Sequence, residues 1–225
     1  MAIFRDRIDA GRHLAARLLP YVEGHRFVVL GLARGGVAVA EQIALALGVE
    51  FDVLVLGKVA VPGRRDLTMA SVTGGGLDLV NQDVIDEFEV GPETYRRLAE
   101  DARRDVLRRE LIYRGDREPR DLVGKLVVLV DDGVATGMTM RAAVEGVRAQ
   151  TPARVLVAVP VAPVLACEEL RLVADAVIAV HTPQPFYGIG QWYRQFPKAT
   201  DEEVREALAR NWRSSFVRSE SWVPA

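Results

Sequence analysis

The sequence predicts an α/β fold, built as a doubly wound and mostly parallel five-stranded sheet. Five short segments are almost continuously apolar instead of alternating, which is typical of strands that helices cover on both faces. These segments are residues 27–32, 53–56, 126–130, 155–159 and 176–180. Helical patterns separate most of them, at residues 37–47, 139–149 and 164–173. Strands that alternate with helices in this way favour right-handed crossovers within one sheet.

The 225 residues are enough for one domain with an insertion. We expect a single domain over residues 1–212. Residues 213–225, where no periodicity is visible, are expected to form a loose tail or one that a partner subunit orders. The interval 59–124 is too long for one crossover. It contains a glycine-centred hairpin pattern at residues 69–80 and a charged helical pattern at residues 92–113. We expect this insertion to be either a solvated helix over the sheet or a mobile lid.

Composition excludes several classes of protein. Hydrophobic residues make up 49% of the chain and charged residues 27%, the balance of a globular protein. A formal charge of −2 argues against a broad nucleic-acid surface. The single cysteine, Cys167, excludes an internal disulfide and a cysteine-rich zinc site. The sequence contains neither an apolar stretch long enough for a membrane span nor the apolar segment of a signal peptide. We therefore expect a cytoplasmic protein that binds neither nucleic acid nor membrane.

The most informative residues follow the strand at residues 126–130, because ligands of open α/β sheets bind beyond the carboxyl ends of the strands. Asp131 and Asp132 come first, and two adjacent carboxylates need hydroxyl, metal or cation partners. A turn of small and hydroxyl residues then leads into a helix, whose first amides favour an anion. That turn consists of Ala135, Thr136, Gly137, Met138 and Thr139. The pattern indicates a sugar-phosphate site, with carboxylates for ribose hydroxyls and an amide cup for a terminal phosphate.

The sequence does not contain the motifs of two other phosphate-binding loops. The chain contains no Gly-Lys-Ser/Thr of a nucleoside-triphosphate P-loop, and the turn lacks the Gly-x-Gly-x-x-Gly dinucleotide pattern. Residues 127–139 instead resemble the 13-residue phosphoribosyl pyrophosphate (PRPP) signature of type I phosphoribosyltransferases. One position departs: Gly133 stands where that family usually has an aliphatic residue.

The resemblance extends over residues 3–211. Residues 31–37 resemble the family's pyrophosphate loop, and residues 57–63 resemble the start of its flexible loop. Residues 181–200 are similar to the hood over the base site in a subgroup of phosphoribosyltransferases without a settled substrate. Asp66 stands where that subgroup is expected to have Glu, so no role is transferred to it.

The resemblance implies PRPP-dependent phosphoribosyl transfer to a nitrogenous base or related small molecule, with Mg²⁺ as the cofactor and release of pyrophosphate. Asp131 and Asp132 would hold the ribose hydroxyls, and the 135–139 turn would hold the 5′-phosphate. The pyrophosphate would meet Arg34, Gly35, Gly36 and Lys58. The aromatic residues that would stack on the base, or alternatively cap the sheet edge, are Phe186, Tyr187 and Trp192. No metal ligand is assigned.

Two other functions stay open at this point. One is a PRPP or nucleotide sensor that keeps the fold and has lost turnover, since fold alone does not grant activity. The other is a phosphate-ester hydrolase that uses the acidic pair with Mg²⁺. The resemblance also makes a homodimer possible. It does not identify the acceptor.

Overall fold

A computed structural model describes residues 2–75 and 78–220. Its main sheet has five parallel strands in the order β2-β1-β6-β7-β8. Their bounds are Phe27–Leu32 for β1, Phe51–Leu54 for β2, Leu126–Val130 for β6, Arg154–Val161 for β7 and Ala176–His181 for β8. The predicted five-stranded sheet is confirmed. The chain leaves β1 toward one edge and returns at β6 on the other side, so the topological switch point lies between these two strands.

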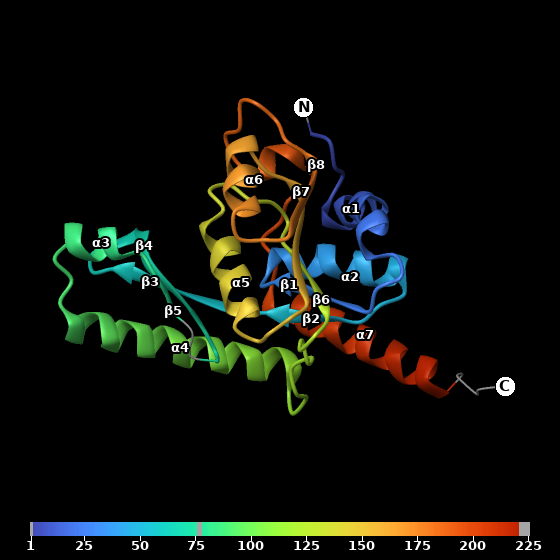
Figure 1. Ribbon diagram of the computed structural model, residues 1–225, viewed down its shortest axis with the longest axis horizontal. Coiled ribbons are helices and arrows are strands. Elements are labelled where there is room, and N and C mark those ends of the chain that lie inside the picture. The colour runs from blue at the N-terminus through green and yellow to red at the C-terminus, as the bar shows by residue number, and fades with distance from the viewer. Residues whose placement is uncertain (1, 76–77, 221–225) are drawn as a thin grey trace.

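Helices cover both faces of this sheet (Figure 1). They are α1 (Arg7–Val22), α2 (Gly35–Leu47) and α7 (Asp201–Glu220) on one face, and α5 (Met138–Arg148) and α6 (Val164–Arg171) on the other. Alternate residues of β6 belong to the two cores: Val128 and Val130 to the first, Val127 and Leu129 to the second. Burial on both faces is the physical reason why the strand sequences show no polar alternation.

The insertion forms an arm that projects from the side of the sheet (Figure 1). The second sheet of the protein lies in this arm and has three antiparallel strands in the order β3-β4-β5. The arm comprises β3 (Leu56–Val61), β4 (Arg64–Thr73), β5 (Asp78–Val80), α3 (Gln82–Glu87) and α4 (Pro92–Arg114). The predicted hairpin corresponds to β4 and β5. The segment expected to be one strand at residues 53–56 is instead divided, because β2 ends at Leu54 and β3 begins at Leu56.

Helix α4 packs on the small sheet of the arm. A Cβ added at Gly57 of β3 would lie 2.9 Å from Val106 Cγ2 and 3.1 Å from the Ala102 carbonyl oxygen of α4, so glycine allows this close approach. The sequence suggested a helix over the main sheet. In the structure α4 instead contacts β3 and β4 of the small sheet, while its last turn, at Tyr113, reaches α7 of the main body.

Of the tail predicted over residues 213–225, residues 213–220 are helical, because α7 continues to Glu220. The helix is anchored upstream by a buried stripe of Val204, Ala207, Leu208 and Trp212. Once this stripe is packed, each further helical residue adds a backbone hydrogen bond without a new nucleation cost. Residues 221–225 of that prediction, and the side chain of Asp66, lie outside the described part of the chain. Among the described residues, helices are too short or too polar to cross a bilayer.

A buried ion pair joins the end of the arm to the main sheet. Arg114, the last residue of α4, places Nε 2.9 Å and 3.1 Å from the two carboxylate oxygens of Asp52 on β2, and it also donates to the carbonyl of Val53. The Arg114 side chain is 7% exposed and that of Asp52 is 1% exposed. The backbone N–H of Arg120 donates to the same carboxylate. The pair therefore fixes the position at which the end of α4 meets the main sheet.

Removing one partner of this pair should destabilise the protein strongly. Arg114→Ala leaves a buried, uncompensated Asp52 carboxylate, which costs about 3–5 kcal/mol and should lower Tm by on the order of 10 °C. Arg104→Ala is a matched control, because Arg104 forms an exposed i,i+3 pair with Asp101, and such pairs contribute less than about 1 kcal/mol. Thermal unfolding of both variants tests this, and equal Tm values would contradict it.

Candidate functional site

The loops that follow β1 and β6 meet at the switch point of the main sheet. A Cβ added to Gly35 would lie 2.0 Å from Asp132 Oδ2. One added to Gly36 would lie 2.4 Å from the Val130 carbonyl oxygen and 2.8 Å from Asp131 Cα. No side chain fits at either position. The predicted pyrophosphate loop and the predicted ribose-binding pair, which are far apart in sequence, are therefore in direct contact.

Asp132 has a cation partner that the sequence did not reveal. Arg7, the first residue of α1, places Nε 2.7 Å from Asp132 Oδ2, and both side chains are largely buried. The same guanidinium donates through Nη1 to the Pro197 carbonyl at 2.6 Å and lies over the Phe196 ring at 4.0 Å. The sequence indicated that the acidic pair needs hydroxyl, metal or cation partners. The local sequence contains no basic residue for this purpose, and tertiary folding supplies Arg7 from 125 residues away.

The two carboxylates differ in their surroundings. Burial raises the pKa of Asp131 well above its usual range, and the neighbouring charge of Asp132 raises it further. Burial also raises the pKa of Asp132, but the bond from Arg7 opposes that increase. Asp132 thus has its counter-charge within the protein. Asp131 accepts only the backbone N–H of Asp132 among the described hydrogen bonds, at 2.8 Å. It is the carboxylate with capacity left for a ligand hydroxyl or a cation.

The predicted phosphate turn is open at the start of α5. Ala135 and Thr136 are exposed, and Gly137 adopts a left-handed conformation with φ of 82° just before the first helical residue, Met138. No side chain caps this helix start. The first N–H groups of a helix have no partner within it, and the helix dipole adds positive potential there. Residues 135–139 thus form a partly exposed turn that leads into the uncapped start of α5.

Gly133, the position that departs from the family signature, packs against the hood. A Cβ there would lie 2.6 Å from Ile189 Cγ2. The Ile189 side chain, from the segment before the short helix Gly190–Trp192, fills the space beside this glycine. An aliphatic side chain of the hood therefore lies beside Gly133, which has no side chain of its own.

The N-terminus holds the hood in place. The backbone N–H of Phe4 donates to the Trp192 carbonyl, and that of Arg194 donates to the Phe4 carbonyl, each at 2.9 Å. The Tyr193 hydroxyl donates to the backbone carbonyl of Asp132 at 2.6 Å. The hood is thus bonded to both the N-terminal segment and the acidic loop.

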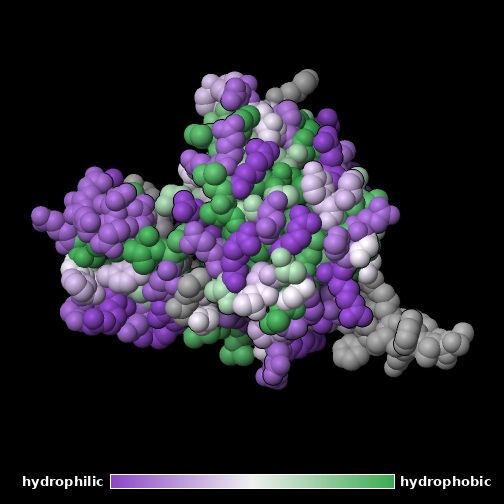
Figure 2. Space-filling view, viewed as in Figure 1, coloured by the Kyte–Doolittle hydropathy of each residue, from purple (hydrophilic) through white to green (hydrophobic). Residues whose placement is uncertain are grey.

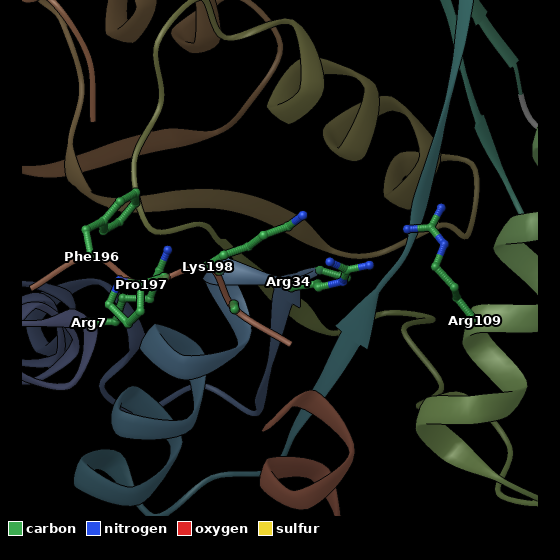
Figure 3. Close-up of a pocket in the computed structure, with 9 residues that line it drawn as sticks. Arg7, Arg34, Arg109, Phe196, Pro197 and Lys198 are labelled. Carbon is green, nitrogen blue, oxygen red and sulfur yellow. Dashed lines mark hydrogen bonds between the residues drawn. The ribbon is translucent and has the colours of Figure 1, made fainter. Parts of the chain in front are cut away.

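A cavity of about 510 Å³ opens beside these loops (Figure 3). Four cationic side chains from four parts of the chain line it, and no carboxylate is among its lining residues in the described part of the chain. They are Arg7, Arg34, Arg109 and Lys198. Figure 3 shows Phe196 and Arg7 at one end and Arg109 of α4 at the other, with Lys198 and Arg34 between them. An anion is the ligand that such a lining favours.

Each arginine of this cavity lies within ion-pair distance of a carboxylate. Arg7 pairs with Asp132 at 2.7 Å, Arg34 with Asp201 at 2.8 Å, and Arg109 with Asp105 at 2.9 Å. These pairs restrict the arginine rotamers before a ligand arrives, which reduces the entropy lost on binding. The sequence predicted Arg34. Arg7, Arg109 and Lys198 carried no local signal, because they lie in helices and a loop whose positions only the fold determines.

Some predicted site residues lie elsewhere. Lys58 was expected at the end of a main-sheet strand, but it is an exposed residue of β3 opposite Ser71. Its charge still lowers the pKa of Asp131, so it lies near the acidic loop without lining the cavity. Among the predicted aromatic residues, Trp192 stacks on Phe186 and contacts the edge of His181, while Tyr187 is 84% exposed. The aromatic residue found in the cavity lining is Phe196.

An α/β sheet with this strand order, whose switch point joins an acidic strand-end loop to a glycine loop, has the type I phosphoribosyltransferase fold. Known proteins agree with this assignment. Residues 3–170 match the phosphoribosyl transferase domain family. Two Mycobacterium tuberculosis proteins, named "Putative phosphoribosyl transferase MT0597" (strain CDC 1551) and "Putative phosphoribosyl transferase Rv0571c" (strain H37Rv), are each 37% identical over 210 residues. This alignment covers 93% of this chain and 47% of each relative, so the chain spans about half the length of these relatives.

A solved structure is similar over its whole length. TT1426 from Thermus thermophilus is 40% identical, with a TM-score of 0.79 and coverage of 92% of this chain and 98% of that one. The chain belongs to the phosphoribosyl transferase family. The resemblance inferred from the acidic loop is thereby confirmed.

Asp131→Asn should raise Tm at neutral pH. Because the pKa of Asp131 is raised, its ionised form is disfavoured in the folded state. This cost begins as pH rises above the unfolded pKa of about 4. The Tm of the variant should therefore be a few degrees higher than that of wild type at pH 8, since ~1 kcal/mol corresponds to about 2–4 °C for a protein of this size. At pH 5 the difference in Tm should be smaller. Asp101→Asn, at an exposed position, controls for charge. A difference in Tm between Asp131→Asn and wild type that does not grow with pH would contradict the raised pKa of Asp131.

The contact of Gly133 with Ile189 predicts a coupled pair of substitutions. Gly133→Ala should cost about 1–3 kcal/mol, because the added methyl group overpacks the site. In an Ile189→Ala background the same change should cost much less, since the obstructing atoms are gone. Chemical denaturation of the four proteins gives the coupling energy directly. Additive effects would show that Ile189 does not fill this space.

Proposed function

We propose that this chain transfers the phosphoribosyl group of PRPP to a nitrogenous base or related small molecule, with Mg²⁺, and releases pyrophosphate. The observation that carries the proposal is the contact between the 34–36 loop and the Asp131–Asp132 pair at the switch point, beside a cavity lined by cations. Such a site offers carboxylates for hydroxyls, amides for one phosphate and guanidinium groups for a second anion. PRPP carries these groups together on one ribose.

The proposed reaction requires little covalent chemistry from the protein. The bond between the anomeric carbon and the pyrophosphate oxygen breaks, and the pyrophosphate leaves with the electron pair. A nitrogen atom of the acceptor forms the new bond and then releases its proton. The protein contributes position and charge stabilisation. Asp131 would hold the ribose hydroxyls, residues 135–139 would hold the 5′-phosphate, and Arg34 with Gly35 and Gly36 would hold the leaving pyrophosphate.

The acidic loop fits Mg²⁺ as part of a substrate complex. Among the described residues there is no group of three or more His, Cys, Asp or Glu side chains placed to hold a metal ion. Mg²⁺ usually keeps several waters and binds through one or two carboxylates plus substrate phosphates. Asp131, which forms no ion pair in the described part of the chain, is the carboxylate that fits this arrangement. When bound, Mg²⁺ would neutralise charge that develops on the pyrophosphate.

The cavity also suggests where the acceptor lies. Phe196 presents an aromatic ring at the hood end of the cavity, and Arg7 is stacked over that ring. The Tyr193 ring also stacks on Phe196, with the ring centroids 4.8 Å apart, so a planar base would contact the part of Phe196 that stays exposed. Phe186, Tyr187 and Trp192 stay alternative contacts for the base, and the capping contacts of Trp192 with Phe186 and His181 are those of a packed sheet edge.

The direct test measures ligand binding and turnover separately. PRPP with Mg²⁺ should raise Tm of the wild-type protein, and Asp131→Ala with Asp132→Ala should abolish that shift. Asp101→Ala on the exposed face of α4 is the matched control and should keep the shift. Pyrophosphate release is then measured with a panel of purine and pyrimidine bases.

Three results separate the candidate functions. Pyrophosphate release that depends on one base supports the transferase. PRPP binding without turnover on any base would indicate a sensor instead. Hydrolysis of phosphate esters without PRPP would indicate a Mg²⁺-dependent hydrolase. A missing PRPP shift in the wild-type protein would contradict the assignment of the site.

A further inference from the structure

Arg34 is bound on one edge by a carboxylate from the C-terminal helix. Its Nε lies 2.8 Å from Asp201 Oδ1, and its Nη2 donates to Asp201 Oδ2 at 3.4 Å. Two nitrogens of the planar guanidinium thus face the two oxygens of one carboxylate, the bidentate arrangement that fixes orientation as well as distance. The Tyr113 side chain also interacts directly with this guanidinium, and together with Asp201 it raises the pKa of Arg34. Arg34 still lines the cavity together with Gly35.

Asp201 is itself held by the arm. It is the first residue of α7, and the hydroxyl of Tyr113, in the last turn of α4, donates to its Oδ1. This bond from Tyr113, together with Arg34, lowers the pKa of Asp201. Burial raises the pKa of Tyr113, so the phenol keeps its proton and acts as a donor. A chain of contacts therefore runs from α4 through α7 to the 34–36 loop.

We propose that Asp201 is a positioning residue, which holds the Arg34 guanidinium in the orientation that receives the pyrophosphate group, with Tyr113 supporting Asp201. This inference rests on the proposed function, because it assigns a partner to the pyrophosphate loop. Arg34 otherwise has several freely rotating bonds, and ordering such a side chain on binding costs affinity. Asp201 removes that cost before the ligand binds.

The direction in which pyrophosphate affinity changes distinguishes a positioning role of Asp201 from a purely electrostatic one. A carboxylate close to an anion site repels the anion, so removing it should by charge alone tighten binding. A positioning role predicts the opposite result. Asp201→Asn should weaken binding of Mg²⁺–pyrophosphate by about three- to ten-fold, the amount expected for losing the order of one long side chain.

The chain offers a matched control in the next residue. Glu202 is also in the first turn of α7, but it pairs with Arg205 on the exposed surface. Glu202→Gln removes the same charge from the same helix end without touching Arg34. It should leave Mg²⁺–pyrophosphate affinity unchanged or slightly increased.

The experiment is isothermal titration of Mg²⁺–pyrophosphate into wild type, Asp201→Asn, Glu202→Gln and Tyr113→Phe, with Tm recorded for each protein. Tyr113→Phe should weaken binding in the same direction as Asp201→Asn but by less, and it provides a second test if Asp201→Asn folds poorly. In an Arg34→Ala background, Asp201→Asn should cause no further loss, because Asp201 acts through Arg34. A merely structural role would not depend on Arg34 in this way.

The outcomes are distinguishable. Equal affinity for Asp201→Asn and Glu202→Gln would overturn the positioning role. Tighter binding by Asp201→Asn would also overturn it, and would make Asp201 a competitor for Arg34. Failure of the wild-type protein to bind Mg²⁺–pyrophosphate would overturn the proposed function, and this inference with it. In turnover assays, the positioning role predicts a higher KM for PRPP in Asp201→Asn than in Glu202→Gln.

Discussion

Two adjacent carboxylates are confined at the end of β6, and the geometry of the site follows from that confinement. Asp132 is buried against Gly35, so close that no other residue fits there. Its charge requires a partner inside the protein, because burial of an unpaired carboxylate is costly. Arg7 is that partner, and it also binds the hood at Pro197. One ion pair thus joins α1, the acidic loop and the hood, and it leaves Asp131 for the ligand.

The same use of paired charge recurs around the cavity. The chain as a whole is slightly acidic, with a formal charge of −2, yet the lining is cationic. The carboxylates that pair with these arginines are Asp132, Asp201 and Asp105, and none of the three is among the residues that line the cavity. An anion-binding site can therefore exist without an overall basic surface. Figure 2 accordingly shows polar and apolar side chains mixed over the visible face, including the arm.

The arm takes part in the site although it has its own sheet. Arg109 of α4 lines the cavity, and Tyr113 of the same helix binds Asp201. The buried pair of Arg114 with Asp52 holds this end of α4 against the main sheet. The idea of a lid was drawn from the length of the insertion, and it stays a prediction. The structure adds that the base of the arm supplies two side chains, Arg109 and Tyr113, beside the loops at the switch point.

Local sequence was sufficient to predict the parallel sheet, the hairpin of the arm and the acidic loop, because each depends on a short pattern: continuous apolar segments, a glycine turn, and a strand that ends in two carboxylates. It also singled out Arg34, in the glycine loop after β1, and this residue lines the cavity. Which other cations face the cavity could not be predicted in this way. Arg7, Arg109 and Lys198 come from an N-terminal helix, the arm and the hood, and nothing in their local sequences distinguishes them from surface cations. Their role follows from packing, because the fold brings four distant segments to the one edge where parallel strands leave room for a ligand.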